Sequence, residues 1–83
     1  MRITLKTGGL LKRYLPEIAE GNTAEIDVLE GLSIQGVLEH LGAPADGNYL
    51  IIVNNNAVPP STRGDVILND GDAMSLMPPL KGG

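Results

Sequence analysis

The chain has 83 residues, and its ten acidic and six basic residues give a net charge of −4. This length supports one domain with a single modest hydrophobic core, too small for a deep active-site cleft. The lack of cysteine excludes disulfides, cysteine-ligated metal sites and cysteine nucleophiles, and the excess of acids argues against nucleic-acid binding. Because no stretch resembles a signal peptide or a membrane-spanning helix, we expect a cytoplasmic protein that does not bind membranes.

Two strands are predicted in the first third of the chain. Apolar and polar residues alternate over Arg2–Lys6, which predicts a half-buried strand. The same alternation over Ala24–Leu29 predicts a second strand, antiparallel to the first. Between them, the apolar residues of Leu10–Ile18 have the spacing of a short helix, and Pro16 keeps that helix from being long.

The clearest predicted helix runs from Ser33 to Leu41. Ser33 suits the N-cap position, where its hydroxyl can accept a hydrogen bond from a free N–H of the first turn. The apolar residues fall three and four apart, as in a helix that packs one stripe against a core: Ile34, Val37, Leu38 and Leu41. Gly42 suits a left-handed cap, and Pro44 prevents the helix from continuing.

Three more strands are predicted after this helix, at Tyr49–Val53, Ala57–Val58 and Ala73–Met77. The first of them is a nearly continuous apolar run, which suits a strand covered on both faces. Turns are predicted at Asn54–Asn56, because asparagine tolerates positive φ, and at Asn69–Asp72. The chain is therefore predicted to be an α+β domain, with a mixed sheet of four to five strands and one main helix across it.

Residues 1–77 form this predicted domain, and residues 78–83 form a predicted extended tail. Two prolines force an extended path at the start of the tail, whose sequence is Pro78, Pro79, Leu80, Lys81, Gly82 and Gly83. Glycine has no Cβ, so a terminal glycine pair can enter channels that exclude other residues. A carboxylate carried in this way can reach a buried site on another protein, where adenylation would make it reactive.

Within the domain itself, no catalytic group is predicted. Gly8-Gly9 lacks the flanking residues of a phosphate-binding loop. His40 stands alone and is interpreted as a surface residue, because a catalytic or metal site needs a convergent set of groups. Asp70 and Asp72 lack the spacing of a calcium loop and are interpreted as turn residues.

Met74 and Met77 on the last predicted strand have two interpretations. In the simpler one, each occupies one sheet face at an edge of the core. In the other, they belong to an exposed apolar patch beside the tail, where a partner protein would dock.

Several segments occur in an order that is typical of one family: Ile3–Lys6, the helix 33–41 closed by Gly42, Ile52-Val53-Asn54, Leu68–Asp72 and Pro78–Gly83. On these segments the chain resembles the ubiquitin-like sulfur carriers, above all the small subunit of molybdopterin synthase and its relative in the thiamine pathway. The resemblance implies a β-grasp fold. It also implies that Gly83 is adenylated and then converted to a thiocarboxylate, and that residues 78–82 present it.

The resemblance further implies a carrier that is not itself an enzyme. Its expected partners are an adenylyltransferase similar to the ubiquitin-activating enzymes, a sulfur donor protein and the large subunit of molybdopterin synthase. The activating partner would use the ATP, so the chain is expected to hold no cofactor and no metal. Three alternatives stay open: a carrier for thiamine thiazole or another sulfur metabolite, a ubiquitin-like modifier of lysines, and an interaction module with an inert tail.

Overall fold

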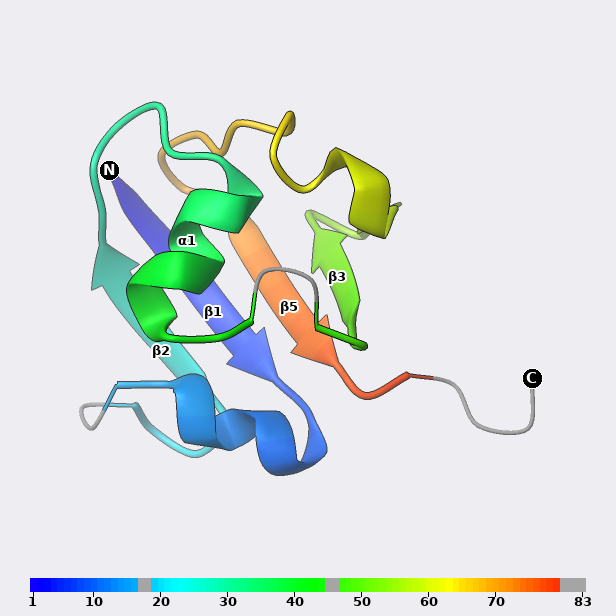
Figure 1. Ribbon diagram of the computed structural model, residues 1–83. Helices are drawn as coiled ribbons and strands as arrows, with labels where there is room; N and C mark the ends of the chain where they lie inside the picture. Colours follow the sequence, from blue (N-terminus) through cyan, green and yellow to red (C-terminus); the bar gives the residue numbers. More distant parts are fainter. Residues whose placement is uncertain (17–18, 45–46, 80–83) are drawn as a thin grey trace.

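The computed structural model describes residues 1–16, 19–44 and 47–79. In these residues five strands form one sheet, and one α-helix packs across it (Figure 1). Two short 3₁₀ helices, η1 and η2, lie in the connections. The elements in chain order are β1 (Arg2–Thr7), η1 (Gly9–Tyr14), β2 (Thr23–Asp27), α1 (Ile34–Leu41), β3 (Leu50–Val53), β4 (Asn56–Val58), η2 (Pro60–Thr62) and β5 (Ala73–Met77). The predicted α+β class is confirmed.

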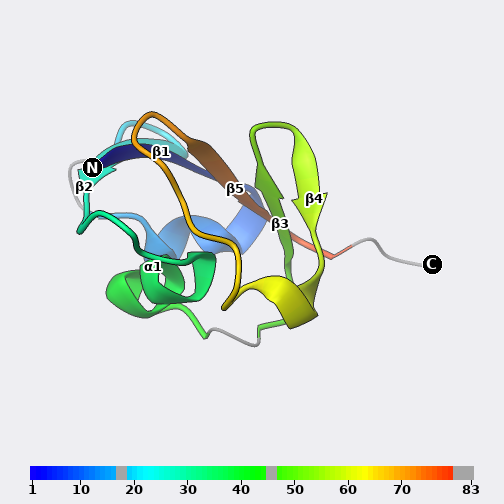
Figure 2. The ribbon, with the colours of Figure 1, turned by 90° about the horizontal axis from the view of Figure 1, so that it is seen from above.

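The hydrophobic core lies between the sheet and the helices, which gather on one side of it (Figure 2). The largest fully buried side chains include Ile3, Leu5, Ile34, Leu38, Ile51, Leu68, Met74 and Leu76. In the described part of the chain no helix covers the other side of the sheet, which we call the open face. The prediction that both faces of β3 are covered is therefore wrong: Ile51 is buried, whereas its neighbour Leu50 is 41% exposed.

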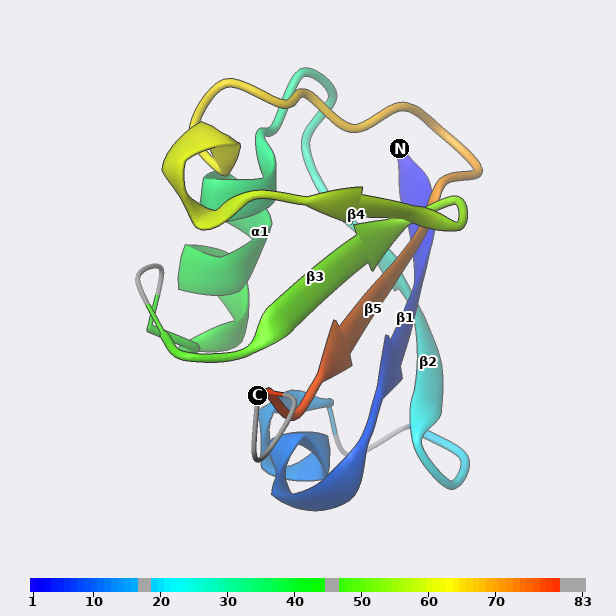
Figure 3. The same cartoon turned by 90° about the vertical axis from the view of Figure 1, so that its right-hand side faces the viewer.

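The strands follow the order β2-β1-β5-β3-β4 across the sheet. The first and last strands, β1 and β5, run parallel in the middle, and the other neighbouring pairs are antiparallel. The predicted mixed sheet and the antiparallel pairing of the first two strands are thus confirmed. Because β1 and β5 are parallel, both end at the same edge of the sheet. Figure 3 shows η1 and the end of β5 together at this edge.

Both predicted caps of α1 are confirmed. Ser33 has extended backbone angles, and its Oγ accepts a hydrogen bond from the Gly36 N–H at 3.1 Å. Gly42 has φ 78°, a left-handed conformation that costs glycine little, and its N–H donates to the carbonyls of Leu38 and Glu39. These local signals fix where the helix begins and ends.

The β3–β4 turn forms where it is predicted, and the short helix predicted before β2 forms as a 3₁₀ helix. Asn54 and Asn55 both have positive φ, as expected for the tight β3–β4 turn. The short helix predicted within residues 10–18 forms as the 3₁₀ helix η1, which begins at Gly9 and ends at Tyr14, two residues before Pro16. Within the described residues, no helix is long and apolar enough to span a membrane.

Candidate functional site

The last strand leads directly to the predicted tail. β5 ends at Met77, and Pro78 and Pro79 are exposed beyond it. The remaining predicted tail residues lie outside the described part of the chain: Leu80, Lys81, Gly82 and Gly83. Their roles in presenting and carrying a reactive carboxylate stay predictions. The base of the tail, where Pro78 leaves the sheet, belongs to the described residues.

Gly8 and Gly9 lie against this base. The Gly8 N–H donates to the Leu76 carbonyl at 2.9 Å, which extends the parallel pairing of β1 and β5 by one residue. A Cβ on Gly8 would lie 2.9 Å from Met77 Sδ and 3.0 Å from Pro78 Cδ. A Cβ on Gly9, whose φ is 55°, would lie 3.2 Å from Pro78 Cγ. The glycine pair therefore lets the chain after β1 pass closely against the first residue of the tail.

The sequence alone does not reveal this role of the glycine pair. In the sequence, Gly8-Gly9 is interpreted only as a pair that lacks the flanking residues of a phosphate-binding loop. The available signal was the position of two adjacent glycines at the end of a first strand that pairs with the last one. That signal has meaning only when the parallel pairing of β1 and β5 is known.

The two methionines of β5 point to opposite faces of the sheet. Met74 is fully buried in the core, so the interpretation that it belongs to an exposed docking patch is wrong. Met77 is half-buried on the open face, opposite Leu50 of β3. Leu50 is followed on the same face by Ile52, whose partner on β4 is Ala57. We call Leu50, Ile52, Ala57 and Met77 the open-face patch; it is a small apolar surface next to the tail base.

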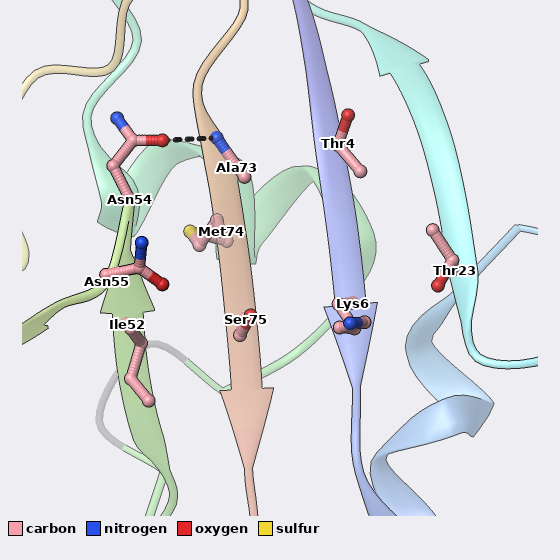
Figure 4. A pocket seen from close by; sticks show the side chains of 9 residues that line it. All are labelled: Thr4, Lys6, Thr23, Ile52, Asn54, Asn55, Ala73, Met74 and Ser75. Carbon is pink, nitrogen blue, oxygen red and sulfur yellow. Dashed lines mark hydrogen bonds between the residues drawn. The ribbon is translucent and has the colours of Figure 1, made fainter.

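A shallow hollow of about 340 Å³ lies beside this patch on the open face (Figure 4). It is lined by Thr4, Lys6, Thr23, Ile52, Asn54, Asn55, Ala73, Met74 and Ser75. Asn54 holds one end of it: its Oδ1 accepts from the Ala73 N–H at 3.0 Å, and its Nδ2 donates to Asp72 at 2.8 Å. Among these described lining residues there is no carboxylate and no histidine. The hollow offers hydroxyls, amides and one ammonium group, which suit contact with a partner rather than acid–base chemistry.

In the part of the domain that the structure describes, charged side chains have structural partners or face solvent. Asp70 accepts from the Arg2 backbone N–H at 2.7 Å, and Asp72 accepts from the Asn69 backbone N–H at 2.8 Å, which confirms them as turn residues. Arg2 Nε lies 3.3 Å from Asp27 Oδ1, and this hydrogen bond and the charge of Arg2 lower the pKa of Asp27. His40 is exposed on α1. Among the described residues, no three histidine or acidic side chains gather as a metal site would require.

Arg63 is a buried structural residue that the sequence did not reveal. It is 2% exposed, and its guanidinium donates to the carbonyls of Tyr49 at 2.7 Å and Gly47 at 3.1 Å. The guanidinium also lies 4.8 Å from the centre of the Tyr49 ring, a cation–π contact. Arg63 therefore ties the end of η2 to the segment that leads into β3. A single arginine in a polar loop carries no pattern from which this role could be read.

These features define the class of the protein. A mixed sheet with its first and last strands parallel in the centre, one helix across it, and a terminal segment that leaves the last strand is the ubiquitin-like β-grasp fold. The sequence pattern of the ThiS family matches residues 13–83, and the chain belongs to the ThiS family. The resemblance to the ubiquitin-like sulfur carriers is thereby confirmed. No curated protein sequence matches the chain significantly.

Solved structures of similar proteins confirm the fold. Molybdopterin converting factor subunit 1 from Pyrococcus furiosus is 20% identical with a TM-score of 0.69, over 95% of this chain and 98% of that one. Small archaeal modifier protein 1 from Haloferax volcanii is 22% identical with a TM-score of 0.68, over 95% and 98%. A chain in the complex of subunits 1 and 2 of the molybdopterin-converting factor from Helicobacter pylori is 19% identical with a TM-score of 0.65, over the full length of both.

Proposed function

We propose that this chain is a sulfur carrier for molybdopterin synthesis, whose reactive group is the carboxylate of Gly83. The observation that carries the proposal is the path of the chain end in a ThiS-family fold. The last strand runs to the edge of the sheet, the exposed Pro78 and Pro79 continue it outward, and the sequence ends in Gly82-Gly83. The domain holds the tail, and partner proteins act on it.

The chemistry proceeds in two steps on the partners. A carboxylate oxygen of Gly83 attacks the α-phosphorus of ATP on an adenylyltransferase similar to the ubiquitin-activating enzymes, and pyrophosphate leaves. A hydrosulfide equivalent from a sulfur donor protein then attacks the carbonyl carbon, and AMP leaves, so that the tail ends in a thiocarboxylate. ATP is a co-substrate that the activating partner consumes, and this chain contributes a substrate group and no catalytic side chain.

Docking on these partners uses the open-face patch beside the tail. Leu50 is 41% exposed, and Met77 is half-buried at the point where the tail begins. An apolar surface of this kind gains free energy when a partner covers it. Contact there would bring the partner's active site within reach of a tail that starts at Pro78.

Two observations favour molybdopterin as the destination of the sulfur. Pro78-Pro79 ahead of the tail is more like the molybdopterin branch of the family than the thiamine branch. One of the similar structures is a complex of the two subunits of the molybdopterin-converting factor, which supports a large synthase subunit as the acceptor. The match to the ThiS family supports a second candidate, a carrier for thiamine thiazole. The likeness to a small archaeal modifier protein supports a third, the modification of lysines.

Intact-mass measurement of the protein from its native host tests the carrier function. We expect a fraction of molecules with one terminal oxygen replaced by sulfur, and none in a variant that lacks Gly83. Because an extended terminal tail, as the sequence predicts, would contribute little packing, the truncated protein should unfold at the same temperature as the full chain. Leu29→Ala, a change at an exposed site on the domain, is the control that should keep the sulfur. If the full chain carries no sulfur under sulfur-replete conditions, the proposal is wrong.

Capture of partners by the tagged chain separates the three candidate pathways. Recovery of a large molybdopterin synthase subunit supports the first, recovery of a thiazole-forming enzyme supports the second, and covalent conjugates through lysine support the third. Absence of the large synthase subunit together with either other outcome would contradict the molybdopterin assignment but leave the carrier function standing.

A further inference from the structure

Positive charge is concentrated at the start of the chain. The first 16 residues contain four of the six basic residues, and all ten acidic residues come after them. Arg2 lies at the far end of β1 from the tail and is paired with Asp27. The other three cations, Lys6, Lys12 and Arg13, lie toward the end of β1 and on η1. A protein with net charge −4 thus presents basic side chains at the edge where the tail leaves.

η1 is anchored to the core on one side and presents its charges on the other. Leu11 and Tyr14 pack against the core, whereas Leu10 is 88% exposed and Lys12 and Arg13 are exposed. Arg13 is held in place: its guanidinium lies 5.0 Å from the centre of the Tyr14 ring, and Nη2 donates to Tyr14 Oη at 3.0 Å. We call Leu10, Lys12 and Arg13 the basic ledge.

The position of the ledge relative to the tail is fixed by the glycine pair. η1 begins at Gly9, and both Gly8 and Gly9 lie against Pro78. The helix η1, which carries the ledge, lies on the helix side of the sheet (Figure 2), whereas the residues of the open-face patch belong to the other side. The tail base therefore emerges between an apolar surface and a basic one. A partner protein that binds the tail can therefore contact both surfaces.

We propose that the basic ledge docks on an acidic surface beside the tail channel of the activating adenylyltransferase, with Leu10 in an apolar pocket there. This inference rests on the proposed carrier function and names a second contact for the same partner. Complementary charge favours this occupant, because the ledge's two cations would attract and orient an acidic rim. Nucleic acid is a poorer fit, because its binding needs many phosphate contacts and the ledge offers only the cations Lys12 and Arg13.

Adenylation kinetics with the adenylyltransferase of the same genome test the inference. The carrier's KM and kcat are measured from ATP–pyrophosphate exchange. Leu10→Ala should raise KM roughly tenfold, because burial of a leucine at an interface is lost. Lys12→Gln with Arg13→Gln should raise KM roughly fivefold at low salt, and this difference should vanish at about 0.5 M salt, where exposed charges are screened. kcat should stay unchanged, because the tail itself is intact.

Matched variants at the opposite end of the molecule control for hydrophobicity and net charge. Leu29→Ala removes another exposed leucine, at 79% exposure. Gln35→Glu with Ser61→Glu changes the net charge by the same amount as the two ledge substitutions, at exposed sites on α1 and η2. Both controls should keep the wild-type KM, and thermal unfolding should show that every variant is folded.

The outcomes separate this inference from the function on which it rests. If the wild-type chain is adenylated and the ledge variants keep its KM and salt dependence, the ledge inference is wrong and the carrier function stands. If the wild-type chain is not adenylated at all, the carrier function and the ledge inference fail together. A rise in KM for both ledge and control variants would show a general charge or hydrophobic effect and would also refute the ledge.

Discussion

Gly8→Ala is expected to disturb the tail far more than it disturbs the fold. Gly8 has φ −117° and ψ 152°, angles that alanine adopts without strain, so the substitution probes steric contact alone. The added Cβ would lie 2.9 Å from Met77 Sδ and 3.0 Å from Pro78 Cδ, against an ordinary contact distance of about 3.5–4.0 Å. The Met77 thioether can turn away, but the Pro78 ring is fixed to the backbone, so the tail base must move by roughly half an ångström or more.

The expected change in the free energy of unfolding is the difference between two opposing contributions. Overpacking of this kind costs about 1–3 kcal/mol, and replacing glycine by alanine recovers about 0.4–1 kcal/mol through the unfolded chain. The net loss is therefore about 1 kcal/mol, which lowers the midpoint of thermal unfolding by roughly 4–8 °C in a domain of this size. Adenylation of the tail should fall by more, about tenfold or beyond, because misplacement of a reacting group by about 1 Å can cost a hundredfold in rate.

Calorimetry measures the midpoint of thermal unfolding, and ATP–pyrophosphate exchange measures the rate at which the tail is adenylated. Gly64→Ala is the matched control: its Cβ would meet the flexible Gln35 side chain at 3.0 Å, far from the tail, and should leave both measurements nearly unchanged. If Gly8→Ala unfolds at the wild-type temperature and is adenylated at the wild-type rate, the contact with Pro78 does not position the tail.

Three further substitutions test the rest of the structure. Ser33→Ala removes the hydrogen bond to the Gly36 N–H and should destabilise the domain by about 1 kcal/mol in urea unfolding, whereas Ser61→Ala should have little effect. Arg63→Met leaves the carbonyls of Tyr49 and Gly47 without this donor and should cost about 2–4 kcal/mol by the same measurement; wild-type stability would contradict the anchoring role. Asp27→Asn should weaken the acid dependence of stability. The lowered pKa of Asp27 means that its pairing with Arg2 stabilises the fold above the unfolded pKa and is lost as the pH falls through the folded one. Unfolding measured as a function of pH, at low and at high salt, tests this prediction. If Asp27→Asn loses stability at acidic pH as steeply as the wild type does, the prediction is wrong.

The elements that were predictable from sequence are those fixed by local chemistry. Ser33 and Gly42 mark the ends of α1 because a cap hydroxyl and a left-handed glycine act within a few residues of their partners. Asn54 and Asn55 mark the β3–β4 turn for a similar reason. The alternation in β1 also identifies a half-buried strand, because its period is intrinsic to extended backbone.

The features that the sequence does not predict depend on how many helix layers cover the sheet and on contacts between distant residues. The apolar run that includes Leu50 is equally compatible with a sheet covered on one face or on two, and only the number of helix layers decides between them. Met74 and Met77 are three residues apart and so must face opposite sides, but local sequence does not say which side is the core. Gly8 meets Pro78 from seventy positions away, and that contact exists only because β1 and β5 are parallel neighbours.

The same parallel pairing has a functional consequence. It brings the first connection of the chain, residues 8–14, to the point where its last strand ends, so one of the surfaces beside the tail base is built from residues near the start of the sequence. Adenylation needs only a carboxylate on a narrow tail, and any protein ending in two glycines offers that group. Discrimination among such proteins can therefore use surfaces that the tail does not contain. The basic ledge and the open-face patch differ in polarity and lie on two sides of the tail base. A partner that contacts both surfaces can therefore recognise this protein before the tail reaches the partner's active site.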